Sequence, residues 1–187
     1  GTVLSSPSIL PQTPANSACL EISDEECEAL NLLFIQTQGI SWTNNSGWFS
    51  APKPCAWYGI TCRTIDNTTH IERIDLSWNH LQGSIPMEIG KLSGLRLLDL
   101  SENQLEDSLP VSLGNLSQLQ FLDLSNNQLG GKIPAEIGNL SQLKVLNLSE
   151  NKLAGQLPDT LGNLTMLESL HLFENGFNGD LPLTLPA

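Results

Sequence analysis

The chain has 187 residues, of which 40% are hydrophobic and 15% are charged, and its formal net charge is −12. This length is typical of one domain, and the apolar content is sufficient for a packed core, which excludes a disordered chain. No apolar run approaches the roughly 20 residues that span a bilayer, so we expect no membrane contact by this segment. A surface this acidic repels phosphate groups and argues against nucleic acid as a partner.

Residues 1–18 are rich in Ser, Pro, Thr and Asn and predict a flexible leader. Residues 19–70, which we interpret as an N-terminal cap, contain all four cysteines, an even number that favours disulfides and an oxidising compartment. No Cys-x-x-Cys motif occurs and the histidines are scattered, so neither a metal nor another cofactor is expected. Asn-x-Ser/Thr sequons agree with secretion and give the glycosylation candidates Asn44, Asn67, Asn115, Asn139, Asn147 and Asn163.

A helix is expected near the start of the cap. Ser23 and Glu26 have the spacing of a capping box, and Gly39 is expected to end the helix after about Gln38. Such an amphipathic helix is suited to cover the open end of a repeat array. The side chains expected to be buried are Leu30, Leu33 and Phe34 of the helix and, after it, Trp42, Trp48 and Trp57.

From Ile71 onward the sequence repeats every 24 residues without insertion. Leucine or isoleucine recurs at repeat positions 1, 4, 6, 11, 15, 19 and 22, with asparagine at position 9 and proline at position 16. A fixed period of this length predicts a solenoid. The array comprises four full units and one partial unit, namely 71–94, 95–118, 119–142, 143–166 and 167–187.

Each part of the repeat predicts a local structure. Positions 3 to 7 alternate, which predicts a short strand with positions 4 and 6 facing the interior and positions 3, 5 and 7 facing outward. The asparagines follow the strand, where their amides can satisfy backbone groups of the turn. A second extended segment follows at Gly-x-Ile/Leu-Pro, with a local distortion expected where Asp107 replaces the glycine. The prolines then open a helical turn.

These units resemble the plant-type leucine-rich repeat, whose motif LxxLxxLxLxxNxLxGxIPxxLGxL is followed throughout 71–187. The resemblance implies an α/β solenoid, a right-handed superhelix with a parallel β-sheet on its concave face, a second shorter sheet and a ligand surface on the strand face. The segment Cys55-x-Trp57-x-Gly59-Ile60-x-Cys62 is similar to the N-terminal cap of plant leucine-rich-repeat receptors and polygalacturonase inhibitors. That similarity implies a Cys55–Cys62 disulfide, which leaves Cys19 and Cys27 as the other pair.

Two features of the outward positions suggest a partner surface. Leu97, Phe121 and Val145 form an apolar strip that should face water, and a row of aspartates lies beside it. Either this is a groove for a basic or mixed partner, or Leu-Asp-Leu-Ser is a common form of this strand. Aromatic residues at both ends are candidate anchors or, for Trp78 and Phe173, edge packing. The candidate partner-binding residues are Arg73, Asp75, Trp78, Leu97, Asp99, Phe121, Asp123, Val145, Asn147, His171 and Phe173.

The motifs Gly-x-Ser-x-Gly and His-Glu-x-x-His and a phosphate loop are missing from the sequence, so we do not expect an enzyme. We predict a secreted recognition module that binds a protein or peptide, as a receptor ectodomain does. One alternative is an inhibitor of a secreted hydrolase such as polygalacturonase, which this short array disfavours. The other is ice binding, which the mixed residues at positions 3, 5 and 7 disfavour.

The far end of the array departs from the family pattern. Secreted members usually close that end with a second cysteine pair, whereas no cysteine follows Cys62. The last unit stops at Ala187, before its helical turn is complete. We therefore expect one of two situations. Either the chain is cut from a longer protein, or the uncapped C-terminal edge is covered by a partner or, through self-association, by a second copy of the chain.

Overall fold

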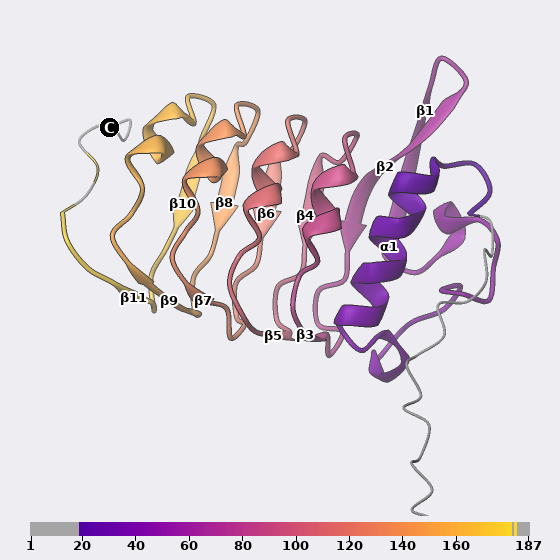
Figure 1. Cartoon of the computed structure of the whole chain (residues 1–187), viewed down its shortest axis with the longest axis horizontal. Helices are drawn as coiled ribbons and strands as arrows, with labels where there is room; N and C mark the ends of the chain where they lie inside the picture. Colours follow the sequence, from indigo (N-terminus) through magenta and orange to yellow (C-terminus); the bar gives the residue numbers. More distant parts are fainter. Residues whose placement is uncertain (1–18, 181, 183–187) are drawn as a thin grey trace, which may run out of the picture.

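The computed structural model describes residues 19–180 and residue 182, so the predicted leader at 1–18 lies outside the described residues. Figure 1 shows a single row of stacked coils that begins at the cap and runs to the C-terminal end. Each full coil contributes one strand to a main sheet, one short strand on a second side, and one helical turn that leads to the next coil. The predicted solenoid with parallel strands is confirmed.

The cap consists of one helix, two short turns and a strand. Helix α1 comprises Asp24–Gln36, and the 3₁₀ helices η1 and η2 comprise Gly39–Ser41 and Pro54–Ala56. Strand β1 (Ile60–Ile65) pairs antiparallel with β2 (Thr68–Asp75), and their hairpin projects beyond the row of strands in Figure 1. Strand β2 is also the first strand of the repeat array, so this hairpin joins the cap to the solenoid.

The main sheet has the strand order β1-β2-β4-β6-β8-β10, parallel from β2 onward. Its later strands are β4 (Leu97–Asp99), β6 (Phe121–Asp123), β8 (Val145–Asn147) and β10 (Ser169–His171). Each described proline at repeat position 16 before residue 180 is the N-cap of a 3₁₀ helix, as predicted. These helices are η3 (Met87–Lys91), η4 (Val111–Asn115), η5 (Ala135–Asn139) and η6 (Asp159–Asn163).

The second sheet is interrupted at the coil that contains Asp107. Strands β3 (Gln82–Gly83) and β5 (Gln104–Leu105) form one pair, and β7 (Gly130–Gly131), β9 (Lys152–Gly155) and β11 (Gly176–Phe177) form a separate sheet. Asp107 has a φ of 66°, in the left-handed region that the repeat glycines occupy. An isolated bridge between Ser108 and Gly130 is what connects the two pieces. The distortion expected at this position is thus a break in pairing.

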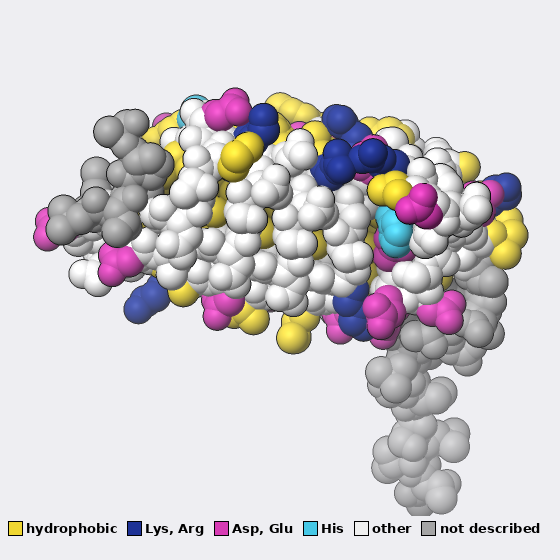
Figure 2. All heavy atoms as spheres, turned by 90° about the horizontal axis from the view of Figure 1, so that it is seen from above, with side chains coloured by type: hydrophobic (Ala, Val, Ile, Leu, Met, Phe, Trp, Pro, Cys, Tyr) yellow, Lys and Arg dark blue, Asp and Glu magenta, His cyan; other side chains and the backbone are white. Residues whose placement is uncertain are grey.

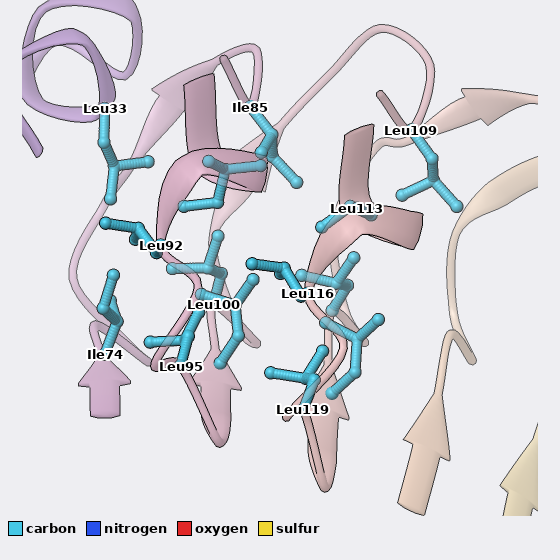
Figure 3. Close-up of a cluster of buried hydrophobic side chains, with 14 of the residues drawn as sticks. Leu33, Ile74, Ile85, Leu92, Leu95, Leu100, Leu109, Leu113, Leu116 and Leu119 are labelled. Carbon is cyan, nitrogen blue, oxygen red and sulfur yellow. The ribbon is translucent and has the colours of Figure 1, made fainter. Parts of the chain in front are cut away.

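The core is a continuous stack of leucine and isoleucine side chains. In the first four coils the inward strand positions, such as Leu122 and Leu124, have no solvent exposure. Figure 3 shows side chains from the strands and from the 3₁₀ segments pointing into one shared interior, with Leu33 of α1 at the cap end. In the last coil Leu170 and Leu172 are half-buried, because no further described coil covers them. Self-association through this edge remains a prediction.

Helix α1 starts as predicted and ends earlier. The capping box between Ser23 and Glu26 is present, and Leu30, Leu33 and Phe34 are buried. The helix ends at Gln36, and Gln38, not Gly39, adopts the left-handed conformation with a φ of 55°. Gly39 is required for packing, since a Cβ there would lie 2.2 Å from the Phe34 ring. Gly39 therefore marks a close approach of the backbone to the Phe34 ring and not the end of the helix.

The cap has an aromatic core of its own. Trp42, Trp48 and Trp57 are buried, and each indole N–H donates a hydrogen bond to a backbone carbonyl oxygen, so the prediction that they pack the cap is right. The ring of Phe34 lies 5.0 Å from that of Trp42 and 5.6 Å from that of Trp48. Disulfides join Cys19 to Cys27 and Cys55 to Cys62.

Candidate functional site

The register of the main sheet arranges nine of the eleven predicted partner-binding residues, together with Ser169, in two columns. One column is Arg73, Leu97, Phe121, Val145 and Ser169, and the other is Asp75, Asp99, Asp123, Asn147 and His171. Adjacent members of a column lie about 4.8 Å apart, the spacing of hydrogen-bonded strands. We call the surface formed by these two columns the strand face.

The first column contains the apolar strip that the sequence predicts to face outward. Leu97, Phe121 and Val145 are directly paired in register and all three are half-buried, whereas the strand residues between the two columns are fully buried. Their side chains therefore lie outside the leucine core. An apolar strip of this kind, in contact with water, is suited to pack against another molecule.

The second column is partly engaged in hydrogen bonds within its own strand ends. The Oδ1 of Asp99 accepts hydrogen bonds from Ser101 N at 3.0 Å and Ser101 Oγ at 2.7 Å, and Asp123 accepts the same pair from Ser125. Asn147 accepts them from Ser149. The expectation that position 7 faces outward is thus wrong for Ser101, Ser125 and Ser149, which are buried because their hydroxyls turn toward these acceptors.

The aspartates nevertheless keep a second oxygen. Asp123 Oδ2 accepts a hydrogen bond from Asn147 Nδ2 at 3.0 Å, so this carboxylate links two coils. Asp75 and Asp99 use Oδ1 for the serine two residues onward. The two interpretations of the aspartate row are therefore compatible for Asp75 and Asp99, because Oδ1 shapes the strand end and Oδ2 is left for a partner, whereas both oxygens of Asp123 are already bonded.

Asp99 lies in the middle of the row and has the least favourable surroundings for a negative charge. Burial raises the pKa of the Asp99 carboxyl above its usual value, the hydrogen bonds from Ser101 oppose the rise, and the charges of Asp123 and Asp75 add to it. The raised pKa means that the carboxylate is less stable in the folded protein than in the unfolded chain. A cation bound at this row would relieve that cost.

We expect the substitution Asp99→Asn to raise the free energy of unfolding at neutral pH by about 0.5 kcal/mol, a value reduced for solvent screening. Asparagine keeps the acceptor for Ser101, as Asn147 does for Ser149. Because the folded-state pKa of Asp99 is raised, its destabilising contribution is fully present above that pKa and disappears toward about pH 3.8, the unfolded value. Urea titrations of both proteins between pH 3.5 and about 7.5 test this. If the stability difference between Asp99→Asn and the original chain grows as the pH is lowered, the prediction is contradicted.

The predicted aromatic anchors lie at opposite ends of the strand face. Trp78 follows β2 and is 72% exposed, while Phe173 follows β10 and is 56% exposed. The rings of His171 and Phe173 are 6.3 Å apart in a T-shaped arrangement. Four strand spacings separate β2 from β10, a distance of about 19 Å, so the structure does not gather these residues into one cluster. They instead delimit a surface with Phe121 near its centre.

The exposure of Trp78 argues against the edge-packing interpretation. Trp78 also has a φ of 54°, and the residues at the same repeat position, such as Glu102 and Asn126, share this left-handed conformation. A bulky ring at such a φ is unfavourable, whereas asparagine tolerates it well. Trp78 lines a shallow pocket with five polar residues, which are His80, Glu102, Asn103, Gln104 and Asn126. Stability alone does not account for a tryptophan here.

Strand β1 extends the strand face in a way that the sequence analysis missed. Thr61 pairs with Arg73, and a second shallow pocket beside them is lined by Tyr58, Gly59, Ile60, Thr61, Arg73, Asp75 and Ser77. The signal that could have identified the hairpin is Asp66-Asn67, two residues with positive φ between β-branched residues. This turn falls outside the 24-residue period and was therefore overlooked.

The sequon asparagines have different surroundings. Asn67 is exposed at the tip of the hairpin, and Asn115, Asn139 and Asn163 are exposed at the ends of η4, η5 and η6. Asn44 is half-buried against Asn79 and exchanges hydrogen bonds with it. The amide of Asn147, which appears among both the partner-binding and the glycosylation candidates, donates to Asp123 and accepts from Ser149. It is the least suited of these sequons to carry a glycan.

Two further properties of the described residues bear on function. Within 19–180 and 182, no three side chains of His, Cys, Asp or Glu are grouped so that they could hold a metal ion. Over the same residues, no helix has both the length and the apolar character required to cross a membrane.

Comparison with known proteins identifies relatives for most of the chain. The family model described as a leucine-rich repeat region matches residues 74–179. The LRR receptor-like serine/threonine-protein kinase FEI 2 of Arabidopsis thaliana is 44% identical over 46 residues, which are 25% of this chain and 8% of that protein. The chain thus spans a small part of that relative's length.

Solved structures match over a greater length. The ectodomain of the receptor kinase SOBIR1 from Arabidopsis thaliana has a TM-score of 0.75 and 32% identity, covering 89% of this chain and 88% of that one. A chain of the BIR3–SERK2 complex, also from Arabidopsis thaliana, has a TM-score of 0.68 and 33% identity, with coverage of 83% and 87%. A plant ice-binding protein has a TM-score of 0.75 and 28% identity, with coverage of 84% and 50%.

The family model covers the solenoid, and the receptor ectodomains share both the cap and the coils over nearly the full length of the two chains. The protein therefore belongs to the leucine-rich repeat family and has the fold of plant leucine-rich-repeat receptor ectodomains.

Proposed function

We propose that the chain is an extracellular, non-enzymatic recognition module that binds a protein or peptide segment on its strand face. The observation that carries this proposal is the half-buried strip of Leu97, Phe121 and Val145 running directly beside the row of aspartates. Apolar side chains supply binding energy and the carboxylates supply charge selectivity. A segment with alternating basic and apolar side chains fits this surface.

Two independent observations support the proposal. A family relative is found in a complex of two proteins, BIR3 and SERK2. The aspartate row is also electrostatically unfavourable in the free protein, since the pKa of Asp99 is raised by burial and by its acidic neighbours. A cationic side chain opposite the row would remove part of this cost on binding.

Selection of a displayed library of random peptides on the immobilised chain tests the proposal. We expect enriched peptides to contain Lys or Arg together with large apolar residues. Their affinity should fall at least tenfold for Phe121→Ser, because a central buried anchor typically contributes more than 1.4 kcal/mol, which is a factor of about 10. Trp78→Asn should also weaken those that reach the β2 end, while leaving the stability unchanged or increased.

The matched control is Val111→Ser, which also removes an exposed apolar side chain but lies in η4, away from the strand face. It should leave the affinity of the selected peptides within about twofold of the original value. Peptides that bind the control and the Phe121→Ser variant equally would contradict the proposed surface. Enrichment of acidic peptides would contradict the proposed charge preference.

The two alternatives are separated by direct assays. Because a plant ice-binding protein has a similar structure, thermal hysteresis has to be measured. We expect no thermal hysteresis, because the outward columns mix apolar, acidic and basic side chains. For the hydrolase-inhibitor alternative, adding the chain to a basic polygalacturonase should leave its activity unchanged. Thermal hysteresis or loss of hydrolase activity would each replace the proposed function.

A further inference from the structure

A pocket away from the strand face gathers basic side chains in this acidic protein. It lies where the β1–β2 hairpin meets the turn before β4. On the face seen in Figure 2, Lys and Arg side chains gather toward the cap end, near a histidine. The residues that define the pocket for this argument are Arg63, Ile65, His70, Ser93, Gly94 and Arg96.

The two arginines of the pocket share one weak internal partner. Glu72 Oε1 lies 3.5 Å from Arg63 Nη1 and 3.7 Å from Arg96 Nε, and both distances are long for a hydrogen-bonded ion pair. Each guanidinium has five N–H donors, so most donors of both arginines have no described protein acceptor. Glu72 is thus one carboxylate for two guanidinium groups, and the buried Glu26, whose Oε1 lies 3.5 Å from His70 Nδ1, is a second carboxylate near the pocket.

A glycine allows close packing at one wall of the pocket. Gly94 holds the repeat position that is occupied by Gln118, Gln142 and Met166 in the following coils. A Cβ at residue 94 would lie 2.8 Å from the Cβ of His70, so a longer side chain has no room above the histidine. Glycine therefore lets the turn before β4 pack closely against His70 of the hairpin, and the pocket lies beside this contact.

The net charge of −12 does not exclude an anion at this place. At physiological ionic strength charges are screened over about 8 Å, so the local potential of the pocket depends on the charged groups close to it, Arg63, Arg96 and Glu72 among them. The argument from net charge applies to polyanions such as nucleic acids, which contact a large area of an acidic surface. A single small anion contacts the pocket alone.

We propose that this pocket binds one oxyanion, a sulfate or phosphate ester, carried on an apolar group. The planar guanidinium groups of Arg63 and Arg96 match the oxygens of such an anion. Ile65, which is exposed and lines the same pocket, supplies a surface for the apolar group. The site is separate from the strand face, and its occupation does not depend on a partner there.

Titration of the chain at low salt with phenyl sulfate and with phenyl phosphate, followed by NMR chemical shifts, tests the proposal. We expect saturable shifts at residues of the pocket, weakening as salt is added, and none with neutral phenol. Arg96→Gln should lower the affinity at least tenfold, the effect of losing a charge-assisted contact. The tighter of the two probes identifies the ester.

Two variants separate binding from a structural role. Lys144→Gln removes a cation at the same repeat position two coils away, where Lys144 Nζ pairs with Glu168 at 3.2 Å, and should leave binding unchanged. Glu72→Gln should strengthen binding about fivefold, since the internal carboxylate competes with the ligand. If the arginines only hold Glu72 in place, neither probe will induce saturable shifts in the original chain or in the Glu72→Gln variant, and this result would overturn the proposal.

The result is independent of the proposed function. Phe121→Ser should leave the oxyanion affinity unchanged, because Phe121 lies on the strand face and not among the pocket residues. Thermal unfolding of each variant confirms that it is folded before binding is compared. If Lys144→Gln and Arg96→Gln lower the affinity for the probe equally, the effect of charge is nonspecific, and this result would also overturn the proposed site.

Discussion

Replacing Asn127 by alanine is expected to lower the free energy of unfolding by about 3 kcal/mol, because several buried polar groups lose their partner at once. The Nδ2 of Asn127 donates to the carbonyl oxygens of Leu100, Leu124 and Ser125 at 2.9 to 3.1 Å, and its Oδ1 accepts from Leu105 N at 2.9 Å. These bonds join two consecutive coils. Chemical denaturation measures the loss, and hydrogen exchange at the Leu105 amide reports its location.

The neighbouring Gln128→Ala variant is the control. Gln128 is exposed, and its side chain accepts one hydrogen bond from Lys152, so its removal should change the stability by less than about 0.5 kcal/mol. If Asn127→Ala lowers the free energy of unfolding as little as Gln128→Ala does, water replaces Asn127 as the partner of these backbone groups. The asparagines at repeat position 9 would then not be what joins consecutive coils.

Glu26→Ala is the second substitution with a large expected effect, a loss of about 3 kcal/mol. Glu26 is buried although its side chain is polar, and it contacts two parts of the chain. Its Oε2 accepts from Ser23 N at 3.3 Å and Ser23 Oγ at 3.0 Å, and its Oε1 accepts from the buried Ile71 N at 3.0 Å. Alanine would remove the acceptor for Ser23 and leave the first backbone amide of the repeat array without a partner, while the hydrogen bond from the backbone N–H of residue 26 to Ser23 Oγ is kept.

Two variants make this prediction specific. Glu25→Ala, in the same turn of α1 but exposed, should change the midpoint of thermal unfolding little. Glu26→Gln keeps an acceptor oxygen for Ile71 and should recover more than half of the loss. If Glu26→Gln is as unstable as Glu26→Ala, the negative charge itself is required, and the contact of His70 Nδ1 with Glu26 Oε1, at 3.5 Å, becomes the explanation.

Local patterns predicted the elements well where the fold repeats and less well where it does not. The capping box at Ser23 predicted the start of α1, but Gly39 did not mark its end, because packing against Phe34 had selected that glycine. The antiparallel strand β1 was missed because it lies before the first repeat. At the ends of the strands simple alternation failed, since Ser101 turns its hydroxyl back to Asp99.

The candidate strand face shows the same division. The sequence alone was sufficient to predict which residues are neighbours in its columns, such as Leu97 beside Phe121, because every coil has the same length. It could not distinguish a free carboxylate from one already bonded within the sheet, as Asp123 is to Asn147. That distinction depends on the rotamers of residues in two different coils.

What the sequence by itself determined is the solenoid, its period, the inward leucines and the order of the outward columns. Each of these follows from a repeat of constant length, in which every coil must bury the same positions against the next. Only the tertiary structure decided how the cap joins the array through Glu26, how exposed Trp78 is, and that Arg63 and Arg96 share one pocket. These features arise from contacts between segments that follow no common period, so no pattern along the chain encodes them.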